Sequence, residues 1–252
     1  MLSRVQELEQ LFILGSVPED KLYPSGLALA EVERLSGIAI NKQSSWYNAS
    51  DGIKITCLNI QSLQAHYEDL KKDFALQQSD VIGLSETWNE NREYHLPGYE
   101  GNFNNAGRGK GVAVFHKSPW IVTKSFTAPS FQFVKVSSQD IDIIIVYRSN
   151  GDNKQELVDS LKKHLDLRKT TVICGDFNIC NRREPQNIVL TSLKAIGFQQ
   201  LIDSPTYKLG GQIDHLYVFS PGLDWTEYEL ILHTPYYSDH SAILFHLNKS
   251  KT

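Results

Sequence analysis

The chain of 252 residues has few cysteines, no excess of positive charge and no long apolar run. Its three cysteines, Cys57, Cys174 and Cys180, lie in or beside apolar segments without metal-ligand spacing, so we expect no disulfide framework and a reducing compartment. The net charge of −4 argues against binding to nucleic acid through gross charge alone, but it is compatible with a local basic groove. Because no run of about 18 apolar residues occurs, we predict no membrane-spanning helix.

The chain also lacks a Gly-x-x-x-x-Gly-Lys-Ser/Thr loop, so it contains no complete ATP site of that kind. With 41% hydrophobic and 21% charged residues the composition is that of a globular protein, and the length suits one large domain with an appendage. Two helical patterns, Leu2–Phe12 and Leu27–Leu35, precede a polar stretch over 41–52. We therefore predict an N-terminal extension and linker over 1–50 and a domain over 51–249.

Short apolar or alternating runs predict a series of strands through this domain. The expected strands are 53–57, 81–84, 111–115, 132–137, 141–146, 172–174, 216–219, 227–232 and 242–247. Helical spacing of apolar residues occurs between them over 65–77, 153–167 and 187–196. Polar side chains follow directly after many of these strands.

The most informative stretch is Val172–Cys180, in which a buried strand runs into Asp176 and Asn178. Residues two apart in extended chain share a face, so this carboxylate and this amide are expected to point together beyond the strand end. The plainer alternative is a polar turn. The recurrence of such clusters after other strands favours a functional site.

These other clusters combine amides, carboxylates, a phenol and a histidine. Glu86 is either turned to solvent or a metal ligand, because a lone carboxylate is costly to bury after an apolar strand. Asp239 with His240 fits either a surface turn or a catalytic pair. The candidates at strand ends are Asn59 with Gln61, Glu86, Tyr147 with Arg148 and Asn150, Asp214, and Asp239 with His240.

The chemistry of this set is consistent. Carboxylate and amide oxygens suit a hard cation, Mg²⁺ with Mn²⁺ as the alternative, whereas zinc is disfavoured because no cluster of cysteine and histidine is available. A histidine beside carboxylates suits acid–base chemistry. Tyr147, Arg148 and Asn150 form a plausible set for binding a phosphate oxygen.

Six motifs in order resemble those of the exonuclease–endonuclease–phosphatase superfamily, and most closely the apurinic-type endonucleases of non-LTR retrotransposons and of some Helitrons. They are Leu-Asn-x-Gln-Ser-Leu, Leu-Ser-Glu-Thr-Trp, Tyr-x-x-Asn, Gly-Asp-Phe-Asn, Ile-Asp-His and Ser-Asp-His, between Ile53 and Leu247. The resemblance implies an α/β fold, a four-layered α/β/β/α sandwich of two mixed sheets packed face to face and flanked by helices. A small helical N-terminal extension would precede it.

The resemblance also implies a role for each motif residue. At the metal, Glu86 would be the main ligand, Asn59 would assist at both metal and phosphate, and Asp239 would complete the shell. Asp176 would orient or deprotonate the attacking water, and Asn178 would steady the transition state.

The scissile phosphate would be contacted by Tyr147 and Asn150. His240, oriented by Asp214, would contact it or act as acid–base catalyst, and the choice of base between Asp176 and His240 stays open. Gln61 departs from the Asp of many abasic-site repair enzymes, which removes one negative charge. This favours a single metal and argues mildly against a repair enzyme.

The N-terminal sequence Ser-Arg-Val, followed by Leu-Phe-Ile-Leu and a charged helix, resembles the C-terminal end of Pif-type helicases. In that family the arginine, here Arg4, contacts nucleotide phosphate. With no ATP loop present, we expect an extension without activity that hints at a helicase module in the same polyprotein.

We expect a magnesium-dependent phosphodiesterase that nicks DNA and leaves a 3′-hydroxyl, located in the nucleus or elsewhere inside the cell. The alternatives are an RNA-directed nuclease or a phosphatase of the same superfamily, or an inactive DNA-binding transposon remnant. Target choice would come from DNA shape and from loops such as Glu90–Lys110 and Ser204–Gly211. The sequence leaves the oligomeric state open.

Overall fold

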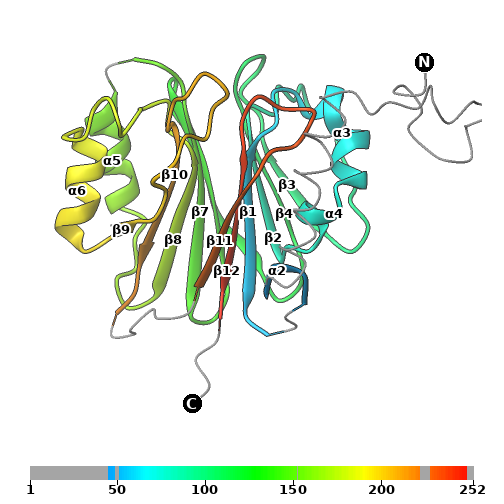
Figure 1. Cartoon of the computed structure of the whole chain (residues 1–252), viewed down its shortest axis with the longest axis horizontal. Helices are drawn as coiled ribbons and strands as arrows, with labels where there is room; N and C mark the ends of the chain where they lie inside the picture. The colour runs from blue at the N-terminus through cyan, green and yellow to red at the C-terminus, as the bar shows by residue number, and fades with distance from the viewer. Residues whose placement is uncertain (1–44, 49–50, 152, 222–227, 249–252) are drawn as a thin grey trace, which may run out of the picture. The chain divides into compact units, whose positions relative to one another are not determined.

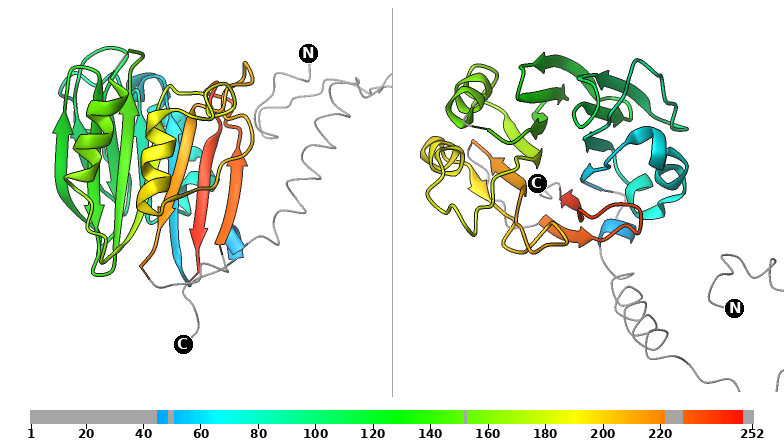
Figure 2. Two further views of the ribbon diagram at one scale, coloured as in Figure 1. Left: turned by 90° about the vertical axis from the view of Figure 1, so that its left-hand side faces the viewer. Right: turned by 90° about the horizontal axis from the view of Figure 1, so that it is seen from above.

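The computed structural model describes residues 45–48, 51–151, 153–221 and 228–248. The N-terminal helical patterns, Arg4 and the start of the strand expected at 227 lie outside these residues. Two mixed six-stranded sheets pack face to face, and helices cover the outer face of each (Figures 1 and 2). The expected four-layered sandwich is thus confirmed. Within the described residues, no helix is both long and apolar enough to cross a membrane.

The first sheet has the strand order β11-β12-β1-β2-β4-β3. Only β1 and β2 pair in parallel, and the other neighbours are antiparallel. In chain order the strands are β1 (Ile53–Asn59), β2 (Val81–Ser85), β3 (Glu100–Asn104), β4 (Val112–His116), β11 (Tyr228–His233) and β12 (Ala242–Leu247).

The second sheet has the order β5-β6-β7-β8-β10-β9, with β7 and β8 parallel and the rest antiparallel. Its strands are β5 (Ile121–Thr127), β6 (Phe131–Ser137), β7 (Ile141–Arg148), β8 (Thr170–Asp176), β9 (Gln199–Gln200) and β10 (Asp214–Phe219). Of these, β5 and β9, like β3 of the first sheet, were not predicted. All three are edge strands with exposed side chains, so their apolar patterns are weak.

The helices lie against opposite outer faces of the sandwich. The first sheet is covered by α2 (Ser45–Asn48), α3 (Leu63–Lys72) and α4 (Phe74–Gln77), and the second by α5 (Lys154–Lys162) and α6 (Ile188–Ile196) (Figure 1). The single helix expected over 65–77 is interrupted at Asp73. The Asp73 carboxylate accepts hydrogen bonds from the backbone N–H groups of Ala75 and Leu76, so it starts a new helix.

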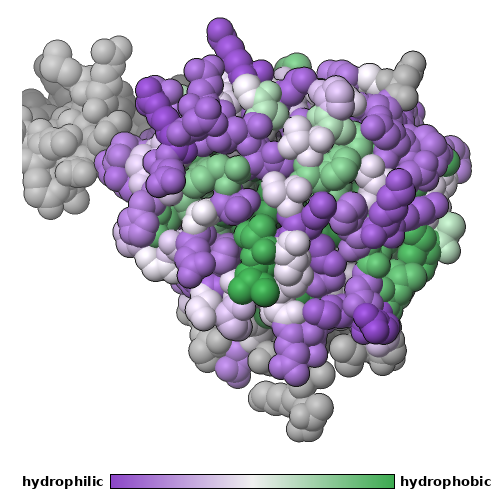
Figure 3. Space-filling view, turned by 180° about the vertical axis from the view of Figure 1, so that it is seen from behind, coloured by the Kyte–Doolittle hydropathy of each residue, from purple (hydrophilic) through white to green (hydrophobic). Residues whose placement is uncertain are grey.

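Three apolar clusters correspond to the three boundaries between layers. One lies between the two sheets, where Ile55 and Phe245 of the first sheet meet Ile145 of the second. The other two lie beneath the helices of each sheet. The face seen from behind is mostly hydrophilic, with an apolar strip at its centre and a further apolar patch at its right edge (Figure 3). The apolar side chains of the strands are thus largely taken up by these three boundaries.

Part of the stretch expected to be a linker belongs to the fold. Ser45–Asn48 forms α2, and the Trp46 side chain is fully buried, with its Nε1 donating to the Ala75 carbonyl at 3.0 Å. An aromatic ring of this size contributes a large buried apolar area. The domain therefore includes residues before 51, while the role of the preceding extension stays a prediction.

The expectation of unpaired cysteines was wrong for two of the three. Cys57 of β1 and Cys174 of β8 form a disulfide that joins the two sheets, and Cys180 is free and buried. Each bridged cysteine stands two residues before a polar strand-end residue, Asn59 or Asp176. The covalent link therefore lies directly beneath the place where those two side chains meet.

Gly175, the residue before Asp176, is required by its surroundings. Its φ is +138°, and a Cβ built there would lie 2.0 Å from the Val146 carbonyl oxygen on the neighbouring strand. Only glycine allows both this backbone conformation and this close approach of β7 to β8. The glycine of the Gly-Asp-Phe-Asn motif thus sets the position of Asp176.

Replacing Gly175 by alanine is expected to destabilise the fold by about 3 kcal/mol or more, because left-handed strain adds to a backbone clash. Gly98→Ala is the matched control: its φ is +81° with nothing within 4 Å of the added Cβ. For this variant we expect a loss of about 1 kcal/mol. Urea denaturation of both variants measures the difference, and equal losses would show that the approach of Val146 is relaxed at little cost.

Candidate active site

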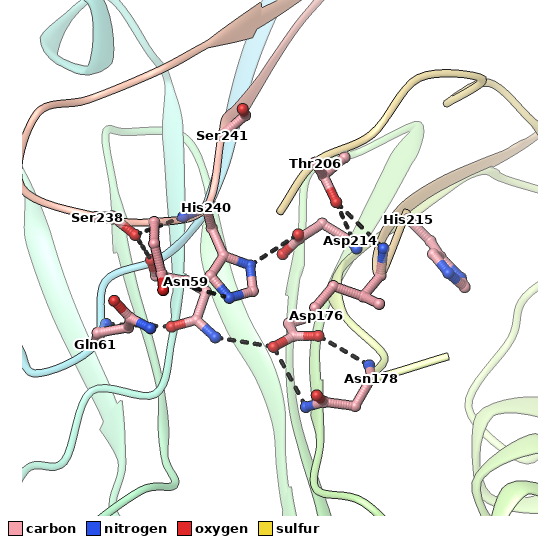
Figure 4. Close-up of polar contacts among 12 residues, drawn as sticks. Asn59, Gln61, Asp176, Asn178, Thr206, Asp214, His215, Ser238, His240 and Ser241 are labelled. Atoms are coloured by element: carbon pink, nitrogen blue, oxygen red, sulfur yellow. Dashed lines mark hydrogen bonds and ion pairs between the residues drawn. The ribbon is translucent and has the colours of Figure 1, made fainter. Parts of the chain in front are cut away.

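The strand ends that carry the predicted polar residues gather at one edge of the sandwich, the upper edge in Figure 1. Strand register explains much of this. Tyr147 on β7 pairs with Asp176 on β8, which in turn pairs with Asp214 on β10. Asn59 ends β1 in the opposite sheet. Residues from both sheets therefore face one another across the gap between the layers (Figure 4).

Asp176 is the centre of the hydrogen-bond network. Its Oδ2 accepts a bond from Asn59 Nδ2 at 2.8 Å, which crosses from one sheet to the other. Its Oδ1 accepts from the backbone N–H of Asn178 at 2.8 Å, and Oδ2 lies 3.3 Å from Asn178 Nδ2. These three donors hold the carboxylate in one orientation, and its side chain is almost completely buried.

Asn178 is positioned by an unusual backbone conformation, with φ at +48°. Asparagine tolerates this left-handed region better than most residues. Its Nδ2 also donates to the Arg148 carbonyl at 2.7 Å, so the amide is tied to both β7 and β8. The expected convergence of Asp176 and Asn178 at one strand end is what the structure has.

Arg148 does not have the position expected of a phosphate ligand. Its side chain is buried, and its guanidinium donates to the Phe177 carbonyl at 3.0 Å and to Asn153 Oδ1 at 2.8 Å. It also donates to the Gly151 carbonyl. These bonds satisfy backbone carbonyls of the loops after β7 and β8, so Arg148 positions the site rather than facing a substrate.

Tyr147 and Glu86 lie on the other side of Asp176 from β10. The Tyr147 hydroxyl donates to the Gly109 carbonyl at 2.9 Å. Burial raises the pKa of Tyr147, and the nearby carboxylates of Glu86 and Asp176 raise it further, so the phenol remains a proton donor. Glu86 follows β2 with φ at +51° and accepts from Trp88 Nε1 at 3.3 Å. It is partly exposed, so its carboxylate can be reached from solvent.

His240 and Asp214 form a buried pair. His240 Nδ1 lies 2.9 Å from Asp214 Oδ2, which leaves Nε2 as the ring atom available to a ligand. Burial alone would lower the pKa of His240, but Asp214, and then Asp176 and Asp239, outweigh it and raise the pKa to about 9. The imidazole is therefore protonated at neutral pH and can donate to an anion.

The pKa of the Asp176 carboxyl is also raised. Burial raises the pKa of its carboxyl to about 8, and the Asp214 carboxylate adds to this effect. His240 and the bonds from Asn178 and Asn59 oppose it. The three donated hydrogen bonds favour the carboxylate form of Asp176, which is the form that can accept a proton as a general base.

Asp239 offers a carboxylate oxygen that is poorly satisfied. Its Oδ2 pairs with Lys208 Nζ at 3.0 Å. Its buried Oδ1 accepts no hydrogen bond within the described part of the chain, and His240 Nε2 lies 3.9 Å from it. Such an oxygen is costly to bury, and a cation nearby would satisfy it.

A second group of residues could also hold a metal ion. Asp176, Asp214 and His240 are all buried, and each offers one ligand atom within 4.8 Å of the others. Within the described residues this is the compact candidate ligand group, and the set of Glu86, Asn59 and Asp239 implied by the motifs stays a prediction.

Two residues that support the site were missed by sequence reasoning. Ser238 donates from its hydroxyl to the Asn59 carbonyl at 2.7 Å and accepts from the His240 N–H at 3.1 Å. Thr206 accepts from the Asp214 N–H at 3.0 Å. Ser238 begins the Ser-Asp-His motif, so its place beside His240 could have been noticed. Thr206 lies in a loop without a local signal.

Other predicted or motif residues lie apart from this network. Asn150 is exposed in the turn after β7, and its substrate contact stays a prediction. His215 points to the opposite side from Asp214, where its Nε2 bonds to the Ile179 carbonyl at 2.8 Å and its ring stacks on Phe177. Burial lowers the pKa of His215 to about 4, so it stays neutral and structural.

Two aromatic side chains of the segment Glu90–Lys110 pack against the rest of the protein. Tyr99 is buried and donates to the Ser79 carbonyl at 2.7 Å, and Phe103 packs edge-on against Phe115. Part of this loop is β3. Arg108 remains exposed, with its guanidinium 5.9 Å from the Trp88 ring centre.

Several solved structures share this fold. An AP endonuclease from Archaeoglobus fulgidus is 18% identical, covers 77% of this chain and 98% of its own, and has a TM-score of 0.58. The endonuclease domain of TRAS1, a telomere-specific non-LTR retrotransposon, is 15% identical, covers 79% and 100%, and has a TM-score of 0.59. A 3′ phosphatase from Neisseria, bound to a product DNA hairpin, is 17% identical, covers 78% and 100%, and has a TM-score of 0.57.

No curated protein matches the chain. The family model for the endonuclease/exonuclease/phosphatase family matches residues 57–240, which include every strand-end cluster described above. With this match, the sandwich fold and the convergent site, the chain belongs to the endonuclease/exonuclease/phosphatase family.

Proposed function

We propose that the protein is a metal-dependent phosphodiesterase that nicks DNA by attack of water and leaves a 3′-hydroxyl. The observation that carries this proposal is the union of two hydrogen-bonded groups in one site. Asp176, held by Asn59 and Asn178, lies within 4.8 Å of the pair of Asp214 and His240, measured between their ligand atoms. The group around Asp176 suits a general base, and the Asp214–His240 pair suits the binding of a negatively charged phosphate oxygen.

In this mechanism Asp176 orients the attacking water and accepts its proton. His240, protonated and oriented by Asp214, donates Nε2–H to a phosphate oxygen as negative charge builds. Asn178 keeps the Asp176 carboxylate aimed at the water, and Tyr147 adds a phenol at the edge of the site. We assign Asp176 as the base because three donated hydrogen bonds favour its carboxylate form, whereas the Asp214 carboxylate favours the protonated form of His240.

A hard divalent cation suits the remaining oxygens. The donor set of Glu86, Asn59 and Asp239 contains two carboxylates and an amide, and the buried Oδ1 of Asp239 is available to a cation. The Asp214–His240 pair already satisfies its own hydrogen bond, which makes it the poorer ligand set. When bound, Mg²⁺ or Mn²⁺ would neutralise charge on the phosphate.

A DNA substrate and an origin in a transposable element are the finer parts of the proposal. They draw on the motif resemblance to retroelement endonucleases, on the fold shared with the TRAS1 endonuclease domain, and on the amide of Gln61. Cleavage of host DNA would place the protein in the nucleus or elsewhere inside the cell. A helicase module in the same polyprotein is a further part of this proposal.

Asp176→Ala and His240→Ala should each slow nicking of supercoiled plasmid with Mg²⁺ by about 10²–10⁴-fold, because each removes a proton-transfer or charge-stabilising group. Conversion of supercoiled to relaxed plasmid measures the rate. Sequencing the cut ends tests for the 3′-hydroxyl. Circular dichroism and thermal melts establish that both variants fold.

The matched controls are Asp159→Ala and His95→Ala, which remove the same side-chain types from exposed positions outside the site. Both should nick plasmid at the wild-type rate. If Asp176→Ala and His240→Ala nick as well as these controls do, the site assignment fails. Wild-type protein that cleaves only RNA, or only DNA 3′-phosphates, would identify one of the alternative activities instead.

Glu86→Gln and Asp239→Asn should weaken Mn²⁺ binding by at least about ten-fold, because each removes a charged oxygen ligand. Isothermal titration or electron paramagnetic resonance of the folded variants measures this without any need for activity. Glu90→Gln is the matched control, since Glu90 is exposed in the same loop as Glu86.

The same titration separates the two candidate ligand groups. Normal Mn²⁺ binding by Glu86→Gln and Asp239→Asn, together with its loss in His240→Ala, would place the cation at Asp176, Asp214 and His240. That result would contradict the assignment of Glu86 and Asp239 as ligands.

A further inference from the structure

A groove of about 480 Å³ opens beside the catalytic group. This volume falls within the range of roughly 300–1,000 Å³ that is usual for small-ligand sites. Its walls are formed by residues of the segments 205–208 and 234–241, and Gln61 also lines it. In Figure 4, Gln61 and Ser238 lie on one side of His240 and Asp214 on the other. Thr206, which also lines the groove, lies on the Asp214 side, so the groove adjoins His240 on both sides.

One wall carries an exposed aromatic ring that is held in place. Tyr236 is 84% exposed, yet its hydroxyl donates to Asp69 Oδ1 on α3, and its ring packs edge-on against Tyr237 at 5.3 Å between centres. Tyr237 in turn donates to Asp73 Oδ2 at 2.9 Å. An exposed ring held at both its edge and its hydroxyl loses little freedom when a ligand stacks on it.

The other wall is fastened to the catalytic loop. The Lys208 N–H donates to the Asp239 carbonyl at 2.9 Å, and the Tyr207 ring lies 4.9 Å from the His240 ring, centre to centre. The Lys208 side chain is 62% exposed, and its ammonium group forms an ion pair with Asp239. Both walls are therefore formed before any ligand arrives, and one of them offers a cation beside the site of attack.

We propose that this groove holds one unstacked nucleobase of the substrate, the base of a nucleotide next to the scissile phosphate, with its face on the ring of Tyr236. Lys208 contacts a neighbouring phosphate, and the hydroxyls of Thr234 and Ser241 face the edge of the base. The inference rests on the proposed function, and it adds which part of a nucleic acid the protein recognises.

A nucleobase fits this groove better than an apolar side chain does. Its lining combines aromatic rings with hydroxyls, an amide and a lysine, and a base presents a flat π-face surrounded by polar edges. Because every base has such a face, stacking tolerates any sequence, and any preference would come from the edge contacts. A base paired within a duplex has both faces covered, so the site requires an unpaired or extruded nucleotide.

The test uses single-stranded DNA with one 2-aminopurine, whose fluorescence responds to stacking, placed in turn at each position around the cleavage junction. Binding is measured in EDTA, so that no cleavage occurs. At one position wild-type protein should change the fluorescence, and Tyr236→Ala should weaken binding by about ten-fold and abolish that change. Tyr236→Phe keeps the ring but loses its hydrogen bond to Asp69, so it should keep the fluorescence change and bind more tightly than Tyr236→Ala. Tyr228→Ala, which removes an exposed tyrosine of β11, is the matched control and should have no effect.

A second substrate lacks the base at the position so identified. On this abasic DNA the penalty of Tyr236→Ala should disappear. An equal penalty on both substrates would show that Tyr236 only supports the loop, and no penalty on either would show that the groove is unused; both results overturn the inference. Binding with the expected fluorescence change but no cleavage by wild type refutes the nuclease and leaves the inference standing. Cleavage by wild type, together with no effect of Tyr236→Ala on binding, supports the nuclease and refutes the inference about the base.

Discussion

The site depends on the hydrogen bond from Asn59 to Asp176, because this bond joins a polar side chain of one sheet to a polar side chain of the other. Asn59 ends a strand of one sheet, and Asp176 ends a strand of the other. The disulfide of Cys57 and Cys174 joins the same two strands, two residues before these strand ends. A shift of one sheet against the other would separate the amide from the carboxylate. The packed core between the sheets prevents such a shift. It therefore keeps Asn59 and Asp176 at hydrogen-bonding distance.

The two sides of Asp176 differ in their chemistry. Toward β10 lies the buried pair of Asp214 and His240, and toward β7 lie Tyr147 and, beyond it, the partly exposed Glu86. A protonated histidine on one side can donate to a phosphate oxygen, whereas the carboxylate oxygens on the other side would hold a phosphate only through a cation. The groove beyond His240 extends this arrangement from the reacting atoms to the rest of a substrate.

The apolar runs of central strands were predicted because burial on both faces demands them, and the residues just past those strands formed the predicted site. Edge strands such as β5 were missed, since their exposed side chains show no apolar face. Arg148 was misjudged for a different reason. A guanidinium at a strand end suits either a phosphate or a set of backbone carbonyls, and only the positions of the following loops show that it donates to carbonyls. Tertiary structure likewise shows that the Tyr99 hydroxyl donates to the Ser79 carbonyl and that Phe103 packs against Phe115.

The sequence by itself determined the order of elements and the strand ends at which polar groups stand. It also supplies Gly175 and Asn178, which tolerate the positive φ angles at the end of β8. These are local properties, set by the alternation of side chains along a strand and by the steric limits of each residue. Tertiary structure decided which face of β10 borders the site: Asp214 faces the site and His215 the helices, because successive residues of a strand point to opposite faces. It alone brought Ser238 to the Asn59 carbonyl and the segments 205–208 and 234–241 together around the groove, since these contacts join segments far apart in the chain.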